Sequence, residues 1–241
     1  MIKIKNISKY FGSKAALKNI NLEIANGETL AIIGGSGSGK STLLRLMIGL
    51  IKPTEGEIWI NDDEISHMND EEINRVRLKM GMVFQYSALF DSMTVGDNVA
   101  FGLVEHTTFT KEKIAAVVHE KLNQVGLENV ELLMPNELSG GMKKRVSLAR
   151  ALAFGPEIIF YDEPSSGLDP VTTNKIDELI ISTQRNLKVT SVVVTHDMIS
   201  ACHIADRIAM VYNGELIAVD TVENFKKIKD VRVQEFLRGI V

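Results

Sequence analysis

A glycine-rich segment near the N-terminus has the residue types and the spacing of a phosphate-binding loop. It reads Gly34-Gly35-Ser36-Gly37-Ser38-Gly39-Lys40-Ser41 and matches the pattern G-x-x-x-x-G-K-[ST]. Glycines allow the backbone to curl so that successive N–H groups point at phosphate oxygens. Lys40 supplies a positive charge to the β- and γ-phosphates, and the Ser41 hydroxyl can bind Mg²⁺. The segment predicts binding of Mg-ATP, helped by the positive end of a helix that begins near Thr42.

Acidic and imidazole side chains follow two apolar segments that are typical of buried strands. Asp162 and Glu163 come directly after residues 158–161, and His196 comes directly after residues 191–195. In an open α/β sheet, ligands bind at the carboxyl ends of the strands, where the phosphate loop also lies. We expect Asp162 to hold Mg²⁺, Glu163 to be the general base for attack of water on the γ-phosphate, and His196 to contact that phosphate. A solvated acidic pair and a structural histidine are the alternatives that these residues leave open.

Gln85 follows a short apolar stretch, residues 82–84, and precedes a long helical pattern. Its amide can orient the attacking water or complete the Mg²⁺ shell, so Gln85 is a candidate for both catalysis and metal binding. Its position between the two patterns would also let it report the state of the nucleotide to the helical segment.

A second glycine motif opens the helical pattern of residues 143–154. In it, Ser139 can cap the helix, while Gly140 and Gly141 leave backbone N–H groups free for an anion. A plain helix cap is the alternative. Because the chain already contains a phosphate loop, we predict that these three residues also bind ATP. One chain then offers one phosphate loop and one such helix terminus, in different lobes.

The elements that must position these residues follow an α/β pattern. Alternating polarity predicts half-buried strands at 1–7 and 20–24, and continuous apolar runs predict buried strands at 29–33, 158–161 and 191–195. The remaining patterns predict a strand at 57–60, helices at 42–50, 111–125 and 171–186, and a hairpin at 208–219 around Asn213-Gly214. We expect one domain with a core of about 1–85 and 156–220, an inserted helical subdomain of about 86–155, and a C-terminal tail of about 221–241 with a short helical pattern.

Composition limits the class of protein. The 241 residues include 27 Lys and Arg against 31 Asp and Glu, a net charge of −4, which argues against a nucleic-acid partner. The single cysteine, Cys202, cannot form an internal disulfide and is most simply a packed residue, so a reducing compartment is expected. No secretory signal core and no run of about 18 apolar residues is visible. A membrane role would therefore depend on a partner that spans the membrane.

The ordered motifs resemble those of the ATP-binding cassette ATPases over essentially the whole chain. They are GGSGSGKST, Gln85, LSGGM, IIFYDEP, SSGLDP and VVVTHD. The resemblance implies a P-loop (RecA-like) NTPase core, an antiparallel β portion near the N-terminus and the inserted helical subdomain. It also implies a head-to-tail dimer with a second copy of the chain, in which Ser139, Gly140 and Gly141 of one copy close on ATP held by the other.

The same resemblance assigns roles to residues outside the phosphate loop. It implies that Asp169 lies in a loop that contacts the second copy, and that Phe11, rather than Tyr10, stacks on the adenine. Met142 and Ser165 stand where Gln and Thr are usual. Neither change removes a phosphate donor, so ATP hydrolysis is still expected.

Three segments look like those of the Mla-type ATPases, which power lipid traffic between bacterial membranes. They are residues 80–103, the Met-ending motif LSGGM with KKRV after it, and the end DVRVQEFLRGI. This likeness implies integral-membrane permease subunits, a lipid-binding partner protein and a peripheral place on the cytoplasmic face of the inner membrane. Polar amino-acid importers share part of the first segment, so a small-solute importer is the alternative.

A soluble cassette protein of DNA repair or translation is a third candidate. The single cassette and the lack of a heptad run argue against this class. The charged stretches 62–64, 70–72 and 143–145 are expected to be solvated faces rather than binding surfaces.

Overall fold

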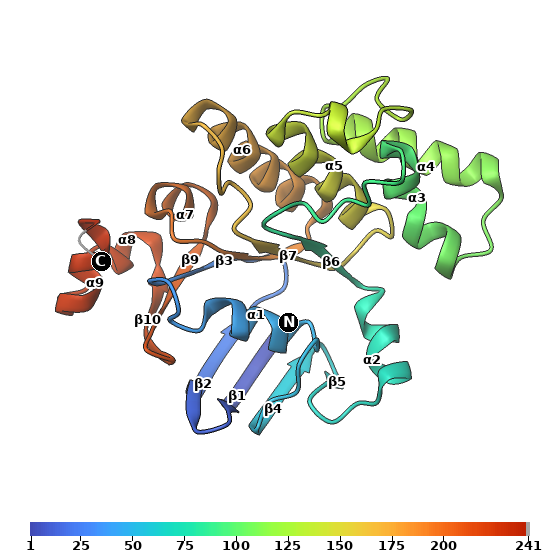
Figure 1. The fold of residues 1–241 in the computed structure, drawn as a ribbon. Coiled ribbons are helices and arrows are strands. Elements are labelled where there is room, and N and C mark those ends of the chain that lie inside the picture. The colour runs from blue at the N-terminus through green and yellow to red at the C-terminus, as the bar shows by residue number, and fades with distance from the viewer. Residues whose placement is uncertain (240–241) are drawn as a thin grey trace.

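The computed structural model describes residues 1–239, which form two β-sheets with a helix between them and further helices on the outer face of the larger sheet (Figure 1). The last two residues of the predicted helical tail, 240–241, lie outside the described residues. No helix in the described part of the chain combines the length and the apolar character that a membrane crossing requires.

The smaller sheet is antiparallel and has the strand order β2-β1-β4-β5. Its strands are β1 (Ile2–Phe11), β2 (Lys14–Ile24), β4 (Glu55–Ile60) and β5 (Asp63–Glu64). The first two strands are longer than predicted. The pairing of β1 with β2 shifts between Ile4 and Ile7, and Asn6 between them has a φ of 51°. This bulge interrupts the alternation of polarity while the ladder continues, so the sequence pattern ends before the strand does.

The larger sheet has the order β10-β9-β3-β8-β7-β6. Five of its strands run parallel, and β10 adds an antiparallel edge. The strands are β3 (Thr29–Ile33), β6 (Met80–Val83), β7 (Ile158–Asp162), β8 (Thr190–Val194), β9 (Arg207–Tyr212) and β10 (Glu215–Thr221). All residues of β3 and β8 are buried, as the continuous apolar runs predict for strands covered on both faces. The hairpin of β9 and β10 is confirmed, with left-handed φ at Asn213 and Gly214.

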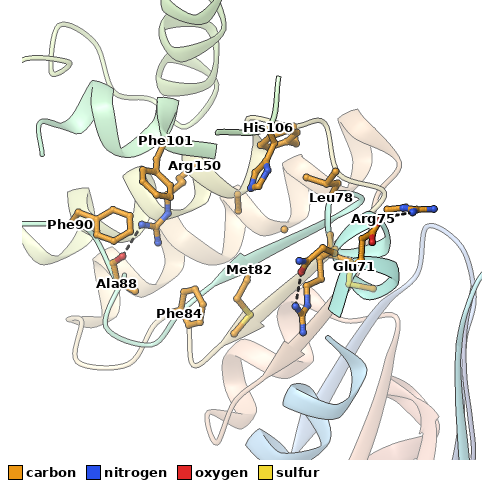
Figure 2. A pocket seen from close by; sticks show the side chains of 16 residues that line it. Glu71, Arg75, Leu78, Met82, Phe84, Ala88, Phe90, Phe101, His106 and Arg150 are labelled. Atoms are coloured by element: carbon orange, nitrogen blue, oxygen red, sulfur yellow. Dashed lines mark hydrogen bonds and ion pairs between the residues drawn. The ribbon is translucent and has the colours of Figure 1, made fainter. Parts of the chain in front are cut away.

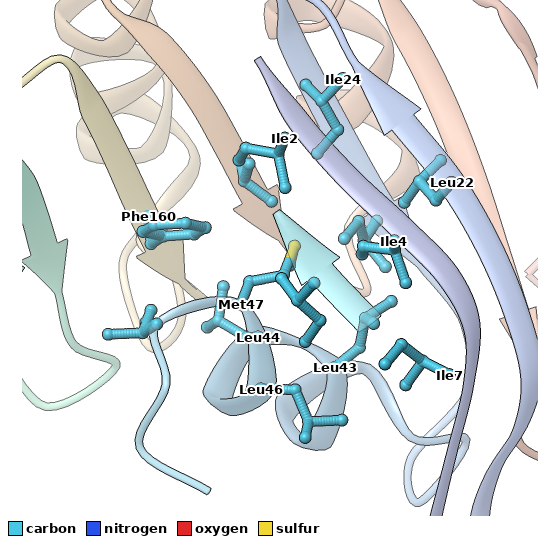
Figure 3. Close-up of a cluster of buried hydrophobic side chains, with 14 of the residues drawn as sticks. Ile2, Ile4, Ile7, Leu22, Ile24, Leu43, Leu44, Leu46, Met47 and Phe160 are labelled. Carbon is cyan, nitrogen blue, oxygen red and sulfur yellow. The ribbon is translucent and has the colours of Figure 1, made fainter. Parts of the chain in front are cut away.

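Helices cover both faces of this sheet. Helix α1 (Lys40–Met47) lies between the two sheets, where Leu43, Leu44 and Met47 pack with Phe160 of β7 and the isoleucines of β1 (Figure 3). The opposite face carries α5 (Gly140–Leu152), α6 (Pro170–Leu187) and α7 (Met198–Ile204). Because strand residues alternate in direction, Tyr161 packs on this second face, next to side chains of α5 and α6.

The segment between β6 and β7 contains helices and no strand. It comprises α3 (Val95–His106), α4 (Lys111–Gln124), the 3₁₀ turn η1 (Pro135–Glu137) and α5. Thr94 and Asp97 form a capping box at the start of α3, and the buried Asn98 side chain bonds to the backbone of Phe90, Met93 and Thr94. These bonds tie the loop after β6 to the first turn of α3.

Three short helices complete the fold. Helix α2 (Asp70–Arg77) precedes β6, and α8 (Val222–Phe225) and α9 (Val231–Leu237) pack their Phe225, Val233 and Phe236 against β9 and β3. The expectation of a solvated stretch at 62–64 is wrong in part, because Asp63 and Glu64 are half-buried in β5 and Glu64 accepts a hydrogen bond from the Ser66 N–H. The stretch 70–72 is exposed, as expected, in the first turn of α2.

The position of Phe160 leads to a stability prediction. Phe160→Ala should lower the free energy of unfolding by about 3–5 kcal/mol, because it removes a fully buried ring from the layer between α1 and β7. Urea unfolding followed by circular dichroism would measure the change. The control is Phe109→Ala, where the ring is 46% exposed and the loss should stay within about 0.5 kcal/mol. An equal loss of unfolding free energy in the two variants would contradict the packing of Phe160 between α1 and β7.

Candidate functional site

The loop between β3 and α1 has the backbone that a phosphate site needs. Gly39 has a φ of 115°, and a Cβ there would lie 2.8 Å from the Ala16 carbonyl oxygen, so a side chain cannot be accommodated. Gly34, Gly37 and Gly39 all have positive φ. Gly39 begins α1 without any side-chain cap, which leaves the N–H groups of the first helical turn available to an anion.

Lys40 is turned into this loop. Its Nζ donates to the carbonyl oxygens of Gly34 (2.7 Å) and Gly35 (3.0 Å), and only 7% of the residue is exposed. Burial lowers the pKa of Lys40, while the nearby carboxylates of Glu163 and Asp162 oppose that shift. The ammonium is therefore held within reach of both the loop and the acidic pair.

Asp162 ends β7 and has an oxygen that fits a metal ion. Its Oδ1 is buried and has no hydrogen-bond partner. Burial raises the pKa of Asp162, and Glu163 adds to the shift, while Arg45, Lys40 and Lys144 oppose it. A cation bound to the free oxygen would compensate its lost hydration.

The donor set fits magnesium better than a protein-only metal cage. Within residues 1–239, no group of three or more His, Cys, Asp or Glu side chains is arranged to hold a metal. Mg²⁺ commonly uses one or two carboxylates together with hydroxyls, water and phosphate oxygens. Asp162 with Ser41 and Gln85 matches that donor set. When bound, the ion would neutralise charge on the phosphate oxygens.

The structure brings Glu163 and His196 together. His196 Nδ1 lies 2.8 Å from Glu163 Oε2, and the imidazole is 65% exposed while the carboxylate side chain is 13% exposed. Glu163 has a left-handed φ of 48° and donates its backbone N–H to the Val194 carbonyl oxygen (2.8 Å). A non-glycine residue adopts this backbone only where neighbouring structure holds it, and such residues cluster at functional sites. A carboxylate held this way can accept a proton from a water molecule in front of it.

Gln85 lies in the loop after β6, on the other side of Asp162. Its side-chain Nε2 donates to Ser166 Oγ over 3.4 Å, and its backbone carbonyl oxygen accepts a hydrogen bond from Lys144 Nζ. The side chain therefore links the loop after β6 to the loop after β7.

Lys144 corrects an expectation from the sequence. The stretch 143–145 was expected to be a solvated face, but Lys144 is only 6% exposed and points toward Gln85 and Glu163. A helical lysine that points inward has no sequence signal of its own, because its surroundings come from other parts of the chain.

The predicted adenine-stacking residue borders the phosphate loop. Phe11 is 54% exposed and lines a cavity of about 540 Å³ with residues of that loop and with Asn213 and Gly214. Lys9 Nζ lies 5.2 Å from the centre of the Phe11 ring. Tyr10 is not among the lining residues. Lys14, Asn213 and Gly214 were missed from the sequence, because they reach this cavity only through the pairing of strands.

The second glycine motif lies at a separate cavity. Ser139 Oγ accepts from the Met142 N–H (3.3 Å) and caps α5, as predicted. Ser139, Gly140 and Gly141 line a space of about 410 Å³ together with Asp169 and Thr172. Asp169 in turn caps α6 through the N–H groups of Val171 and Thr172. A single chain therefore does not place this motif in the cavity of the phosphate loop.

Comparisons with known proteins agree on the class. Residues 17–166 match the family model described as ABC transporter. The chain is 41% identical over 239 residues to the intermembrane phospholipid transport system ATP-binding protein MlaF of Haemophilus influenzae, which covers 99% of this chain and 90% of the relative. It is 44% identical over 220 residues to the methionine import ATP-binding protein MetN of Carboxydothermus hydrogenoformans, covering 90% of this chain and 65% of that relative.

A solved structure has the same fold. The dimeric ATP-binding cassette MJ0796, in a post-hydrolysis state bound to ADP and Pi, superposes with a TM-score of 0.85 at 38% identity, covering 92% of this chain and 99% of the other. The chain belongs to the ABC transporter family, as its ATP-binding subunit. It is an ATPase with the mixed α/β fold of that family.

The geometry of the acidic pair leads to a prediction about turnover. Glu163→Gln keeps the shape of the side chain but removes its ability to accept a proton, so kcat should fall at least about 100-fold. Affinity for ATP, measured by titration calorimetry, should stay within about threefold because the phosphate loop is unchanged. Glu223→Gln, an exposed change on α8, is the control and should hydrolyse ATP normally. Parent-like turnover in Glu163→Gln would rule out Glu163 as the base.

Proposed function

We propose that the chain powers a bacterial phospholipid transporter from the cytoplasmic face of the inner membrane. The substrate class is inferred from the alignment with MlaF of Haemophilus influenzae, which spans 239 residues and extends through the C-terminal segment. A small-solute importer is the second candidate, favoured by the 44% identity to the methionine relative. That alignment is shorter, at 220 residues, and leaves about a third of that relative unmatched. A lipid-binding partner protein belongs to the same proposal.

The site residues take the following roles in this proposal. Phe11 stacks on the adenine, residues 34–42 bind the phosphates, and Ser41, Asp162 and Gln85 hold Mg²⁺. Glu163 accepts the proton of the attacking water, which Gln85 orients, and His196 contacts the γ-phosphate. The orphaned Asp162 oxygen and the paired Glu163 and His196 support these assignments.

A second copy of the chain would complete each site. The phosphate loop and the Ser139–Gly141 motif line different cavities in one chain, so a head-to-tail dimer is the arrangement that lets both contact one nucleotide. Two apolar side chains are exposed at the starts of α6 and α7: Val171 (67%) and Ile199 (85%). Their exposure supports the surface around these two helix starts as one that the second copy covers. The dimeric state of the MJ0796 cassette is a further support.

The permease would dock in an apolar groove next to the loop after β6, which carries Gln85. A cavity of about 880 Å³ lies between α2, β6 and the helical segment, and its walls include Phe84, Phe90 and Phe101 (Figure 2). Each of these rings is about 40% exposed. Phe84 directly precedes Gln85 in the chain, so a permease segment in this groove would contact the loop whose side chain faces the nucleotide.

The shared sites lead to a mixing prediction. Lys40→Ala and Ser139→Arg chains should each be inactive alone, because every composite site then carries a defect. In a mixed dimer both defects fall in one site and the other site is intact, so about a quarter of the parent hydrolysis should return on statistical mixing. ATP hydrolysis by the mixture measures this. No recovery, or a fully active monomer of the parent chain, would contradict the trans arrangement.

The transport function can be tested on the native complex. The tagged chain, purified from its own membranes in mild detergent, should carry integral-membrane permease subunits and enriched phospholipids, identified by mass spectrometry. In detergent solution, added phospholipid should stimulate ATP hydrolysis by the complex, and added methionine should not. Stimulation by methionine without bound phospholipid would instead support the importer, and co-purification of ribosomes or DNA would refute transport.

A further inference from the structure

Two cationic side chains of α5 hold the backbone of the Gln85 loop, residues 85–88. Lys144 Nζ donates to the Gln85 carbonyl oxygen. Six residues further along the helix, Arg150 donates to the carbonyl oxygens of Ser87 (3.0 Å) and Ala88 (2.7 Å). Three of the four carbonyl groups in this loop are therefore bound by charged groups of one helix, and such bonds are stronger than those between neutral groups.

The loop has a backbone that needs this support. Ser87 and Ala88 are consecutive non-glycine residues with positive φ, 61° and 46°. Such conformations are unfavourable for residues with a Cβ and persist where the surroundings hold them. Inside the loop, the Ser87 N–H bonds to the Phe84 carbonyl oxygen and the Ala88 N–H to that of Tyr86. The Tyr86 side chain is 87% exposed, so packing of Tyr86 does not fix the loop.

Lys144 also contacts the backbone of Glu163, the proposed general base. Its Nζ lies 3.4 Å from the Glu163 carbonyl oxygen, so one ammonium bridges the loops that carry Gln85 and Glu163. Lys144 is 6% exposed, and burial lowers its pKa while the carboxylates of Glu163 and Asp162 oppose the shift. A buried ammonium has little water to replace these partners, so losing it leaves the Gln85 carbonyl oxygen without its donor, whereas the Glu163 carbonyl oxygen keeps the bond from the Ser166 N–H (3.2 Å).

We propose that Lys144 is a positioning residue for ATP hydrolysis. Through Lys144 and Arg150, α5 fastens the Gln85 loop, so Gln85, Glu163 and the Ser139–Gly141 turn at the start of the same helix keep a common geometry. This inference rests on the proposed roles of Gln85 and Glu163.

The kinetic test compares Lys144→Met with Lys144→Arg, and Lys143→Met is the matched control on the next position of α5. Lys144→Met keeps the length of the side chain but not its charge, so kcat should fall about 10- to 100-fold through misplacement of the reacting groups. KM for ATP should stay within about threefold, because the phosphate loop is intact. Lys144→Arg should recover most of kcat, and Lys143→Met should match the parent chain.

Hydrogen exchange of the nucleotide-free protein supplies a readout that does not depend on activity. The amides of residues 86–89 should exchange at least about tenfold faster in Lys144→Met than in Lys143→Met, while the amides of β3 stay protected. If Lys144→Met folds poorly, judged by thermal unfolding, Lys144→Gln takes its place. Its amide can still donate one bond, so its losses of kcat and of amide protection should be in the same direction but smaller, and no loss of either would overturn the proposal.

The outcomes separate the inference from the roles on which it rests. Parent-like kcat, an increase in KM alone, or unchanged exchange at residues 86–89 would each overturn the positioning role of Lys144. In a Gln85→Ala background, Lys144→Met should reduce kcat by a smaller factor than in the parent chain. If Gln85→Ala itself leaves kcat unchanged, the proposed role of Gln85 fails, and faster exchange in Lys144→Met would still support the attachment of the loop to α5.

Discussion

The parallel pairing of buried strands is the constraint on which the site depends. β3, β8 and β7 are apolar along almost their whole length and can be satisfied only side by side under two layers of helix. In that register Ile32 pairs with Val194, and Val194 pairs with Asp162. The strands therefore end at one level, and the phosphate loop, the acidic pair and His196 follow at the same edge. The Glu163 N–H, bonded to the Val194 carbonyl oxygen, carries this alignment one residue beyond the sheet.

The charged groups at this edge of the sheet are shielded from water. Asp162 and Glu163 lie close together, and the ammonium groups of Lys40 and Lys144 approach them from two different elements. Burial shifts the pKa of Asp162 upward and that of each lysine downward, while the opposite charges of neighbouring groups oppose these three shifts. The bonds of Lys40 to loop carbonyls and the free oxygen of Asp162 leave capacity for phosphate and metal.

Helix α5 links regions that a simple division into core and helical lobe would separate. Its first turn carries the second glycine motif, its middle holds the Gln85 loop through Lys144, and its apolar side packs under β6 and β7. The wall of the apolar groove proposed for the permease also includes Arg150, from the last turns of this helix (Figure 2). One helix therefore carries the second glycine motif, holds the loop after β6 and borders the proposed permease surface.

The sequence by itself determined the parts that depend on local pattern. Glycine spacing, apolar runs and motif order predicted the phosphate loop, the buried strands, the hairpin at Asn213-Gly214 and the family, because each is set by backbone freedom or by polarity at fixed spacing. Only the tertiary structure decided which side chains meet. Glu163 meets His196 at 2.8 Å, and Lys144 meets Gln85 and Glu163, so these contacts join residues 19 to 59 positions apart. The left-handed backbone at Glu163 and the burial of Lys144 likewise depend on the tertiary structure. Burial and charge at such positions come from neighbouring elements, so a lysine that reads as solvated along the chain becomes an interior cation once α5 packs onto the sheet.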